Sequence, residues 1–222
     1  MNGNAQPWHA WYAGKIFSND WLTARLAPWL MALAPRVADA AEVLEIGSWE
    51  GRSAIAFLEI LPRATITCVD TFAGSPNHQG DPLMREQLSK LEARFDRNTA
   101  GYSRRISKIK CRSVAAMDML IEAGRQFDVI YIDASHRRDD VFADSVMAWR
   151  LLRIGGTLMW DDLRFKLEWA RSERPADAIA MFGAMFGECF TEIHRDKQLF
   201  VVKTADWPAL HVTRKPFRYP KR

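Results

Sequence analysis

The order of short apolar runs and helical patterns after residue 42 limits the possible folds most strongly. Short apolar segments alternate with segments in which apolar residues recur at helical spacing. The predicted strands are 42–46, 65–69, 106–110, 128–132, 156–160, 189–194 and 198–203. The predicted helices are 51–61, 83–95, 114–123 and 138–151. Strands and helices in this order predict an α/β fold with a Rossmann-like, doubly wound sheet that is mostly parallel.

Three segments refine this topology. Phe127 to Ile132 is apolar at nearly every position, which is typical of a central parallel strand covered on both faces. Arg104 to Lys110 alternates charged and apolar residues, which indicates a strand near the edge of the sheet. The last two predicted strands are separated only by a polar turn at Arg195-Asp196-Lys197, so we expect an antiparallel C-terminal hairpin strand.

Composition favours a folded protein and divides the chain into three parts. Hydrophobic residues make up 48% and charged residues 26%, as in ordinary globular domains. We expect an N-terminal helical cap at 1–40, a main domain at 41–205 and a basic tail at 206–222. The cap contains Trp8, Trp11, Trp21 and Trp29, which can pack in the core or cover an active-site mouth. Within it, Pro28 predicts a kink or a break in the helical pattern.

Charge and targeting signals narrow the possible partners. Five basic residues and no acid lie in 211–222, and without them the chain is about neutral. The tail is either solvated or contacts a phosphate, a nucleic acid or a partner subunit. No apolar run approaches the ~20 residues that span a bilayer, and the N-terminus lacks the pattern of a secretory signal. Because Cys68, Cys111 and Cys189 form no metal-like cluster, we expect buried thiols in a cytoplasmic protein.

A ligand site is predicted where the first strand turns into the first helix. Glu45 ends an apolar strand, and Gly47 and Gly51 allow a tight turn that brings backbone N–H groups against a ligand. Asp70 ends the next strand, where it can accept hydrogen bonds from ribose hydroxyls. The ligand is therefore expected to carry a nucleoside.

The details of this turn disfavour a dinucleotide. Trp49 stands where the G-x-G-x-x-G fingerprint has its second glycine, and its bulk would obstruct a pyrophosphate. The carboxylate of Glu45 would repel phosphates but suits a cationic ligand. A nicotinamide-dependent oxidoreductase remains an alternative, as does a non-catalytic module that binds a cofactor or docks a partner.

The turn Glu45-x-Gly47-x-x-x-Gly51 resembles the first motif of class I S-adenosylmethionine-dependent methyltransferases. The resemblance covers roughly residues 42–204. It includes Asp70 as the ribose-binding acid, Cys111-Arg112-Ser113 near the adenine, 127–133 as the fourth strand and 152–158 as the turn into the fifth. It implies S-adenosylmethionine as cofactor. The implied contacts are Glu45, Gly47, Ser48, Trp49, Gly51, Ser53, Asp70, Thr71, Arg112, Ser113 and Asp133.

A second group of acids follows the next two strands. Asp133 comes after 128–132, and Asp161 and Asp162 come after 156–160, so all three are expected at the carboxyl edge of the sheet. Three converging carboxylates would repel one another unless one is protonated or a cation lies among them, and oxygen ligands suit Mg²⁺, Mn²⁺ or Ca²⁺. Alternatively, Asp133 contacts the cofactor while Asp161 and Asp162 cap a loop or helix.

This acidic group resembles the metal site of the O-methyltransferases that act on catechols and caffeoyl-CoA. The resemblance implies Asp133, Asp161 and Asp162 as metal ligands. Those enzymes have asparagine where this chain has Asp162, and the Asp-Asp pair is instead similar to sugar and macrolide O-methyltransferases.

His136 is the candidate catalytic base, with Asp133 as the second catalytic residue. It lies where the catechol-type enzymes carry a lysine near the reacting hydroxyl, and an imidazole exchanges protons near neutral pH. The alternative is a surface histidine that caps the helix from residue 138. His78, in a turn-rich loop at 73–82, is a weaker candidate for substrate contact, and His194 is expected to be structural.

These observations together predict methyl transfer to a hydroxyl of a small molecule. An RNA acceptor is disfavoured because basic charge is confined to the tail and one strand. The identity of the acceptor, oxygen or nitrogen as the methylated atom, and a monomeric or homo-oligomeric state all stay open.

Overall fold

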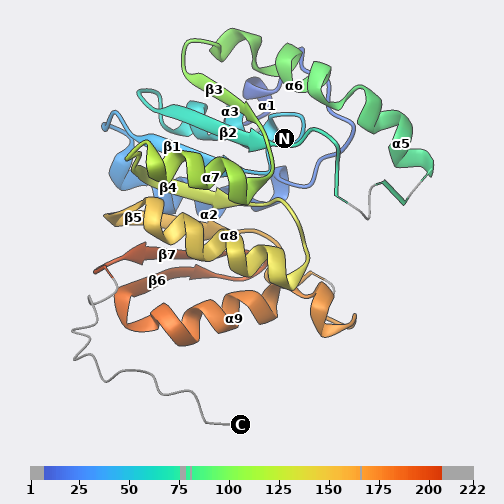
Figure 1. Ribbon diagram of the computed structural model, residues 1–222. Coiled ribbons are helices and arrows are strands. Elements are labelled where there is room, and N and C mark those ends of the chain that lie inside the picture. Colours follow the sequence, from blue (N-terminus) through green and yellow to red (C-terminus); the bar gives the residue numbers. More distant parts are fainter. Residues whose placement is uncertain (1–7, 76–78, 81, 166, 207–222) are drawn as a thin grey trace, which may run out of the picture.

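A seven-stranded sheet with the strand order β3-β2-β1-β4-β5-β7-β6 forms the centre of the molecule (Figure 1). The structure, a computed structural model, describes residues 8–75, 79–80, 82–165 and 167–206. The strands are β1 (Glu42–Ile46), β2 (Thr65–Asp70), β3 (Ile106–Lys110), β4 (Phe127–Ile132), β5 (Leu152–Trp160), β6 (Phe190–Arg195) and β7 (Leu199–Lys203). The first five pair in parallel, and β7 is antiparallel to both β5 and β6. The predicted fold class, the edge strand and the C-terminal hairpin are thereby confirmed.

Helices cover both faces of the sheet. One apolar cluster joins α1 (Trp8–Trp11), α2 (Leu26–Leu33), α3 (Arg52–Ile60) and α6 (Leu91–Thr99) to residues such as Val43 and Tyr131. The other joins α7 (Ser113–Glu122), α8 (Arg138–Leu151) and α9 (Pro175–Phe186) to residues such as Leu44 and Trp160, and these helices lie in front in Figure 1. Adjacent residues of a strand thus point to opposite faces, as the pleat requires.

Three helical features differ from the expected pattern. The predicted helix 83–95 is two helices, α5 (Pro82–Ser89) and α6, because the chain turns at Lys90 and α6 buries Leu91 and Phe95 in the core. The helix α9 was not predicted, although its buried Ala178, Ile179 and Phe182 follow helical spacing. A short 3-10 helix, η1 (Thr23–Arg25), precedes α2, and Pro28 then lies in the first turn of α2, where a missing N–H costs little.

The N-terminal segment packs into the same core as the sheet. Trp29 is fully buried, with its ring 4.4 Å from Phe57 and 4.9 Å from Tyr131, and it donates a hydrogen bond to Gln198 at 3.0 Å. Asn98 of α6 exchanges hydrogen bonds with the backbone of Ile16 at 2.9 and 2.8 Å. Residues 8–33 are therefore packed against α3, α6 and one face of the sheet.

Other expectations concern thiols, membranes and the tail. Cys68, Cys111 and Cys189 are free, and two of them are buried. Among the residues that the structure describes, none of the helices has the length and apolar character needed to cross a membrane. His78 and nearly all of the basic tail lie outside the described residues.

Candidate functional site

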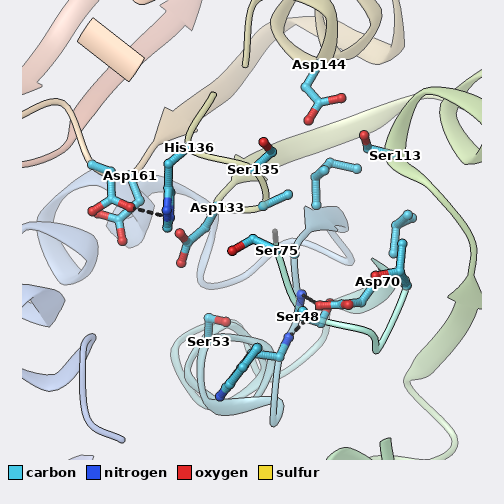
Figure 2. Close-up of a pocket in the computed structure, with 18 of the residues that line it drawn as sticks. Ser48, Ser53, Asp70, Ser75, Ser113, Asp133, Ser135, His136, Asp144 and Asp161 are labelled. Atoms are coloured by element: carbon cyan, nitrogen blue, oxygen red, sulfur yellow. Dashed lines mark hydrogen bonds and ion pairs between the residues drawn. The ribbon is translucent and has the colours of Figure 1, made fainter. Parts of the chain in front are cut away.

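A cavity of about 800 Å³ opens at the carboxyl edge of the parallel strands (Figure 2). The loops after β1, β2, β3, β4 and β5 line it on one side. The N-terminal segment contributes the rest of the wall through Phe17, Trp21, Leu22 and Arg25. Ligands of doubly wound α/β proteins bind at this edge, so the position alone marks the cavity as a binding site.

The glycine turn after β1 requires glycine for a steric reason. Gly47 has a φ of 90°, and a Cβ there would lie 2.0 Å from the backbone oxygen of Asp133. The loop after β1 therefore packs directly on the end of β4, which only glycine allows. Gly51, with a φ of 82°, then begins α3.

The carboxylate of Asp70 organises this turn through backbone hydrogen bonds. Its Oδ2 accepts from the backbone N–H groups of Ser48 and Trp49, both at 2.8 Å, and its Oδ1 accepts from that of Phe72 at 2.6 Å. Burial raises the pKa of Asp70, and these hydrogen bonds oppose the shift. Trp49 and Phe72 both have positive φ, a conformation that non-glycine residues rarely adopt, and Asp70 holds both.

Glu45 lies behind the turn rather than in the cavity wall. Its side chain is fully buried, and neither carboxylate oxygen has a hydrogen-bond partner among the described residues. Burial raises the pKa of Glu45 to about 7, although the nearby Ser48, Ser53 and Cys68 side chains lower it. A proton on this carboxyl, or a cation bound near the turn, would therefore reduce the cost of its buried charge.

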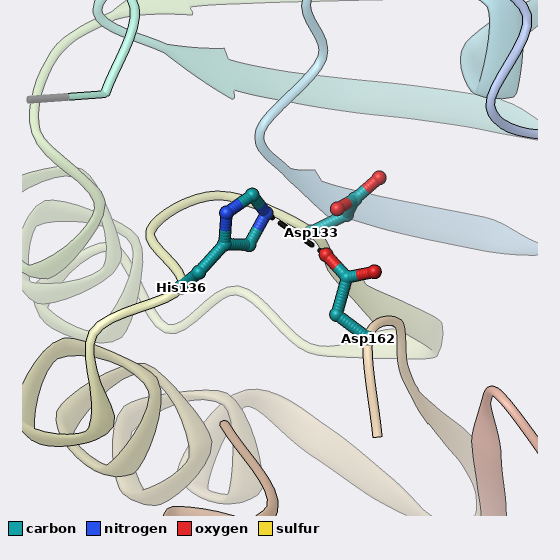
Figure 3. Close-up of side chains that lie close together, drawn as sticks. All are labelled: Asp133, His136 and Asp162. Carbon is teal, nitrogen blue, oxygen red and sulfur yellow. Dashed lines mark ion pairs between the residues drawn. The ribbon is translucent and has the colours of Figure 1, made fainter. Parts of the chain in front are cut away.

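An acidic cluster with one histidine lies at the other end of the cavity. Asp133, His136 and Asp162 each offer one ligand atom, and these atoms lie within 4.8 Å of one another (Figure 3). The Nε2 of His136 is 2.8 Å from an Oδ of Asp162, which has a positive φ of 58°. Two carboxylates and one imidazole form a donor set that fits a divalent cation.

Asp161, the third acid of this cluster, interacts with Arg25 and Tyr131. The guanidinium of Arg25 forms an ion pair with Asp161 and a second one, at 3.3 Å, with Asp162. The hydroxyl of Tyr131 is 3.1 Å from Asp161 and 3.2 Å from Asp133. The cluster thus carries three carboxylates, with one guanidinium and one imidazole against them.

The pKa values in this cluster diverge because the charges are unequally paired. Burial, and then the charges of Asp161 and Asp162, raise the pKa of Asp133 well above its usual range. Burial and Asp162 raise the pKa of Asp161, although Arg25 opposes them. Burial would also raise the pKa of Asp162, but His136 and Arg25 outweigh it, and the net shift is downward. Neighbouring acids with opposite shifts are typical of functional sites.

The structure brings most of the predicted site residues to one cavity. Gly47, Ser48, Trp49, Ser53, Asp70, Thr71, Arg112, Ser113, Asp133, His136, Asp161 and Asp162 all line it. Glu45 and Gly51 support the turn from behind without lining the cavity.

Arg25 and Asp144 are among the lining residues that were not predicted from the sequence. Nothing in the sequence near Arg25 indicates its partners. Asp144 lies one turn from both Val141 and Ala148 on the buried face of its helix, so an acid on an apolar stripe was the available signal.

Comparison with known proteins agrees with this geometry. Residues 44–163 match a family described as a methyltransferase domain, and this region exceeds half of the chain. The chain belongs to that methyltransferase family. A search of curated protein sequences finds no match.

Solved structures with low sequence identity share the fold. The O-methyltransferase NovP is 19% identical with a TM-score of 0.59, and 80% of each chain is covered. A putative O-methyltransferase from Klebsiella pneumoniae is 20% identical with a TM-score of 0.60, over 86% of this chain and 84% of that one. The methyltransferase MycE, 15% identical with a TM-score of 0.58, aligns with 90% of this chain but only 53% of its own length.

Proposed function

We propose that this protein transfers a methyl group from S-adenosylmethionine to a hydroxyl of a small molecule. The observation that carries the proposal is one cavity with two differently built ends. At one end the glycine turn and Asp70 present a carboxylate fixed by backbone N–H groups. At the other end His136 lies against two of the three clustered aspartates.

Asp70 and the turn suit the donor. A carboxylate with two oxygens has about four acceptor positions, and three backbone N–H groups use three of them, so Asp70 can still accept from a ribose hydroxyl. The buried carboxyl of Glu45 behind the turn favours a ligand with positive charge. Structural neighbours include the O-methyltransferase TomG in complex with SAM and MycE in complex with Mg and SAH.

Asp133 and Asp162 would hold a divalent metal ion such as Mg²⁺ beside His136, whose imidazole stays available to the acceptor. Carboxylate oxygens suit such an ion, and it would offset the burial and the charges of Asp161 and Asp162 that raise the pKa of Asp133. A bound ion would supply Lewis acidity that lowers the pKa of an acceptor hydroxyl. Asp161, which is paired with Arg25 and Tyr131, would stand behind these ligands and fix their positions.

His136 would take the proton of the acceptor hydroxyl. Asp162 fixes one ring nitrogen at 2.8 Å, and the ring of Phe165 lies 4.5 Å away by centroids, so the imidazole is held in one orientation. Phe17, Trp21 and Leu22 of the N-terminal segment line the cavity with apolar surface, which would limit the access of water to the reacting groups. Alignment of donor and acceptor then supplies most of the rate enhancement.

The test combines binding and turnover. Calorimetry should detect S-adenosylhomocysteine binding, and a panel of phenols and sugar hydroxyls with S-adenosylmethionine should yield methylated product that EDTA suppresses and Mg²⁺ restores. His136→Ala should lower kcat by about 100-fold and leave S-adenosylhomocysteine affinity within about twofold. The control is His194→Ala, on β6 away from the cavity, which should keep full activity. A fully active His136→Ala enzyme would exclude the base, and absence of S-adenosylhomocysteine binding would overturn the whole proposal.

A further inference from the structure

Three side chains of the glycine turn, those of Trp49, Glu50 and Arg52, contact the N-terminal segment. The rings of Trp49 and Trp21 lie 5.7 Å apart by centroids. The carboxylate of Glu50 accepts a hydrogen bond from the backbone N–H of Ser18 at 2.6 Å. The proposed function assigns the donor to this turn but gives the side chains of Glu50 and Arg52 no role.

Arg52 contacts the N-terminal segment at several points along its length. Its Cζ lies 4.0 Å from the ring centroid of Phe17 and 4.7 Å from that of Tyr12, and a cation over an aromatic face is stabilised there. Its Nη1 is 3.3 Å from an oxygen of Asp20 and 3.3 Å from the hydroxyl of Thr23. The start of α3 therefore fastens the N-terminal segment over the turn.

Residues 15–21, which we name the strap, have little contact with the core. All of them are half-buried or exposed, whereas Leu22 directly after them is buried. The backbone N–H of Ile16 donates to the side chain of Asn98 at 2.9 Å, as that of Ser18 does to Glu50. A segment with few buried apolar contacts opens locally unless such polar contacts hold it.

Glu50 is a buried and rigid anchor for the strap. Its side chain is 1% exposed, and its Oε1 forms an ion pair with the Nε of Arg94 on α6 at 2.6 Å. Its backbone oxygen accepts from the side chain of Asn98 at 3.0 Å. Since both the backbone and one carboxylate oxygen are fixed, Oε2 is held toward Ser18, and a hydrogen bond to a charged acceptor is strong.

The strap continues directly into the wall of the cavity. Phe17 and Trp21 line the cavity, and Arg25, further along the chain, pairs with Asp161 of the acidic cluster. The N-terminal segment thus passes from the glycine turn to the other end of the cavity. A donor that binds against the turn would restrict this wall as well, because Glu50 belongs to the turn.

We propose that Glu50 is a positioning residue that couples donor binding to the wall of the acceptor end. With the donor at the turn, Glu50 holds the strap through the N–H of Ser18, and the strap presents Phe17 and Trp21 to the acceptor. This inference rests on the proposed function, because it takes the donor to be S-adenosylmethionine. It adds an order of binding, with the donor before the acceptor.

Hydrogen exchange with mass spectrometry, in free protein and with saturating S-adenosylhomocysteine, tests this role. In wild-type protein the ligand should slow exchange in peptides that cover 15–21 at least about fivefold. Glu50→Leu removes the acceptor for Ser18, so the strap should exchange about tenfold faster and lose its response to the ligand. Glu50→Gln keeps an oxygen for this N–H and should retain most of the response, although it too loses the ion pair with Arg94.

Two further variants complete the test. Ser18→Pro removes the donor of the same hydrogen bond and leaves Glu50 paired with Arg94, so it should act like Glu50→Leu even if that variant does not fold. Asp128→Leu is the matched control, since Asp128 also accepts a backbone N–H and pairs with an arginine, but at the amino end of β4. It should lower the melting temperature and leave the response of the strap unchanged.

Each outcome separates this inference from the proposed function. If wild-type protein binds S-adenosylhomocysteine in calorimetry and the exchange of the strap does not change, the inference is wrong and the proposed function stands. If Glu50→Gln loses the response as fully as Glu50→Leu, or Ser18→Pro keeps it, Glu50 only supports the fold and the inference is also wrong. If wild-type protein does not bind S-adenosylhomocysteine, the proposed function fails and the inference fails with it.

Discussion

The two ends of the cavity solve the problem of buried carboxylates in different ways. At the β1–β2 end, Asp70 accepts hydrogen bonds from three backbone N–H groups in the loops that follow β1 and β2. At the β4–β5 end, Asp161 and Asp162 are satisfied by side chains, the guanidinium of Arg25 and the imidazole of His136. The first arrangement is part of the backbone, while the second depends on groups that can move or change their charge.

This difference matches the demands of the two ends. A methyl donor that a whole family shares suits a rigid binding site, and backbone hydrogen bonds provide one that does not depend on mobile side chains. Under the proposed function an acceptor would lose a proton and a metal ion would bind, so the second end needs groups that titrate and counter-ions that can be displaced. The comparison predicts that variants at the first end affect donor binding and local order, whereas variants at the second end respond to pH and metal.

The largest effect is expected for Asp70→Ala. The substitution removes the acceptor proposed for the ribose and leaves the N–H groups of Ser48, Trp49 and Phe72 without their partner. One charge-assisted hydrogen bond is worth about 1.5–3 kcal/mol, so its loss together with the loosened turn should lower affinity for S-adenosylhomocysteine at least about 100-fold in calorimetry.

A matched control separates donor binding from general destabilisation. Asp128 also accepts a backbone N–H, that of Glu42 at 2.8 Å, but it lies at the amino end of β4. Asp128→Ala should therefore keep donor affinity within about twofold while it lowers the melting temperature. Unchanged affinity in Asp70→Ala would show that the backbone cradle works without its carboxylate.

The first end of the cavity was also the more predictable from sequence. Glu45, Gly47 and Gly51 are neighbours in the chain, and Asp70 ends the adjacent strand, so strand periodicity and turn chemistry were enough to bring them together. The alternation of apolar runs predicted the strands and the mostly parallel sheet in the same way. Such inferences succeed because the parallel topology itself aligns the strand ends.

The second end was less predictable because its partners are distant in the chain. Arg25 and Asp161 are separated by 136 residues, and the 3-10 helix that carries Arg25 follows from packing of the N-terminal segment on the core. The acids themselves were predicted as a group, but their pairing was not. The prediction of one helix over 83–95 was wrong for a similar reason. Helix α6 begins at Leu91 because burial of this residue in the core overrides local propensity.

A smaller effect, of opposite sign, is expected for Glu45→Gln. The pKa of Glu45 is about 7 in the folded protein against 4.5 ordinarily, so the folded state holds the proton more tightly. The stability contribution of this proton is fully present below pH 4.5 and is lost as pH rises to 7. An uncharged Gln escapes this loss, so the free variant should be about 3 kcal/mol more stable than wild type at pH 8 and nearly equal at pH 4.

Chemical denaturation at the two pH values measures this difference. Glu42→Gln lies on the same strand, with its carboxylate paired to Arg125 at the surface, and should change stability by less than about 0.5 kcal/mol at either pH. If Glu45→Gln is destabilising at pH 8, the carboxylate of Glu45 has hydrogen-bond partners in solution. The β1–β2 end would then contain a carboxylate satisfied by side chains, as the β4–β5 end does.

The smallest effect is expected for Arg25→Met, which removes the cation of the second end and keeps the apolar stem. Loss of the guanidinium raises the folded-state pKa of Asp161 and Asp162, because Arg25 lowers both. The stability that Arg25 contributes through Asp162 is present above the ordinary aspartate pKa and is lost as pH falls through the lowered folded-state pKa of Asp162, so the variant should be less stable by about 2 kcal/mol at pH 8 and the difference should shrink only below pH 4. That figure is reduced for the 24% exposure of the Arg25 side chain.

Added Mn²⁺ sharpens this last test, because a divalent ion can replace the missing guanidinium. It should raise the melting temperature of Arg25→Met more than that of wild type. Arg36→Met is the matched control, since Arg36 also reaches an aspartate from the N-terminal segment, Asp128 at 3.8 Å, but far from the cluster. Its stability should not respond to Mn²⁺ beyond the wild-type shift. An Arg25→Met protein with the same Mn²⁺ response as wild type would mean that Arg25 and the ion do not share the charge of these carboxylates, and the side-chain counter-ions of this end would then be as fixed as the backbone of the other.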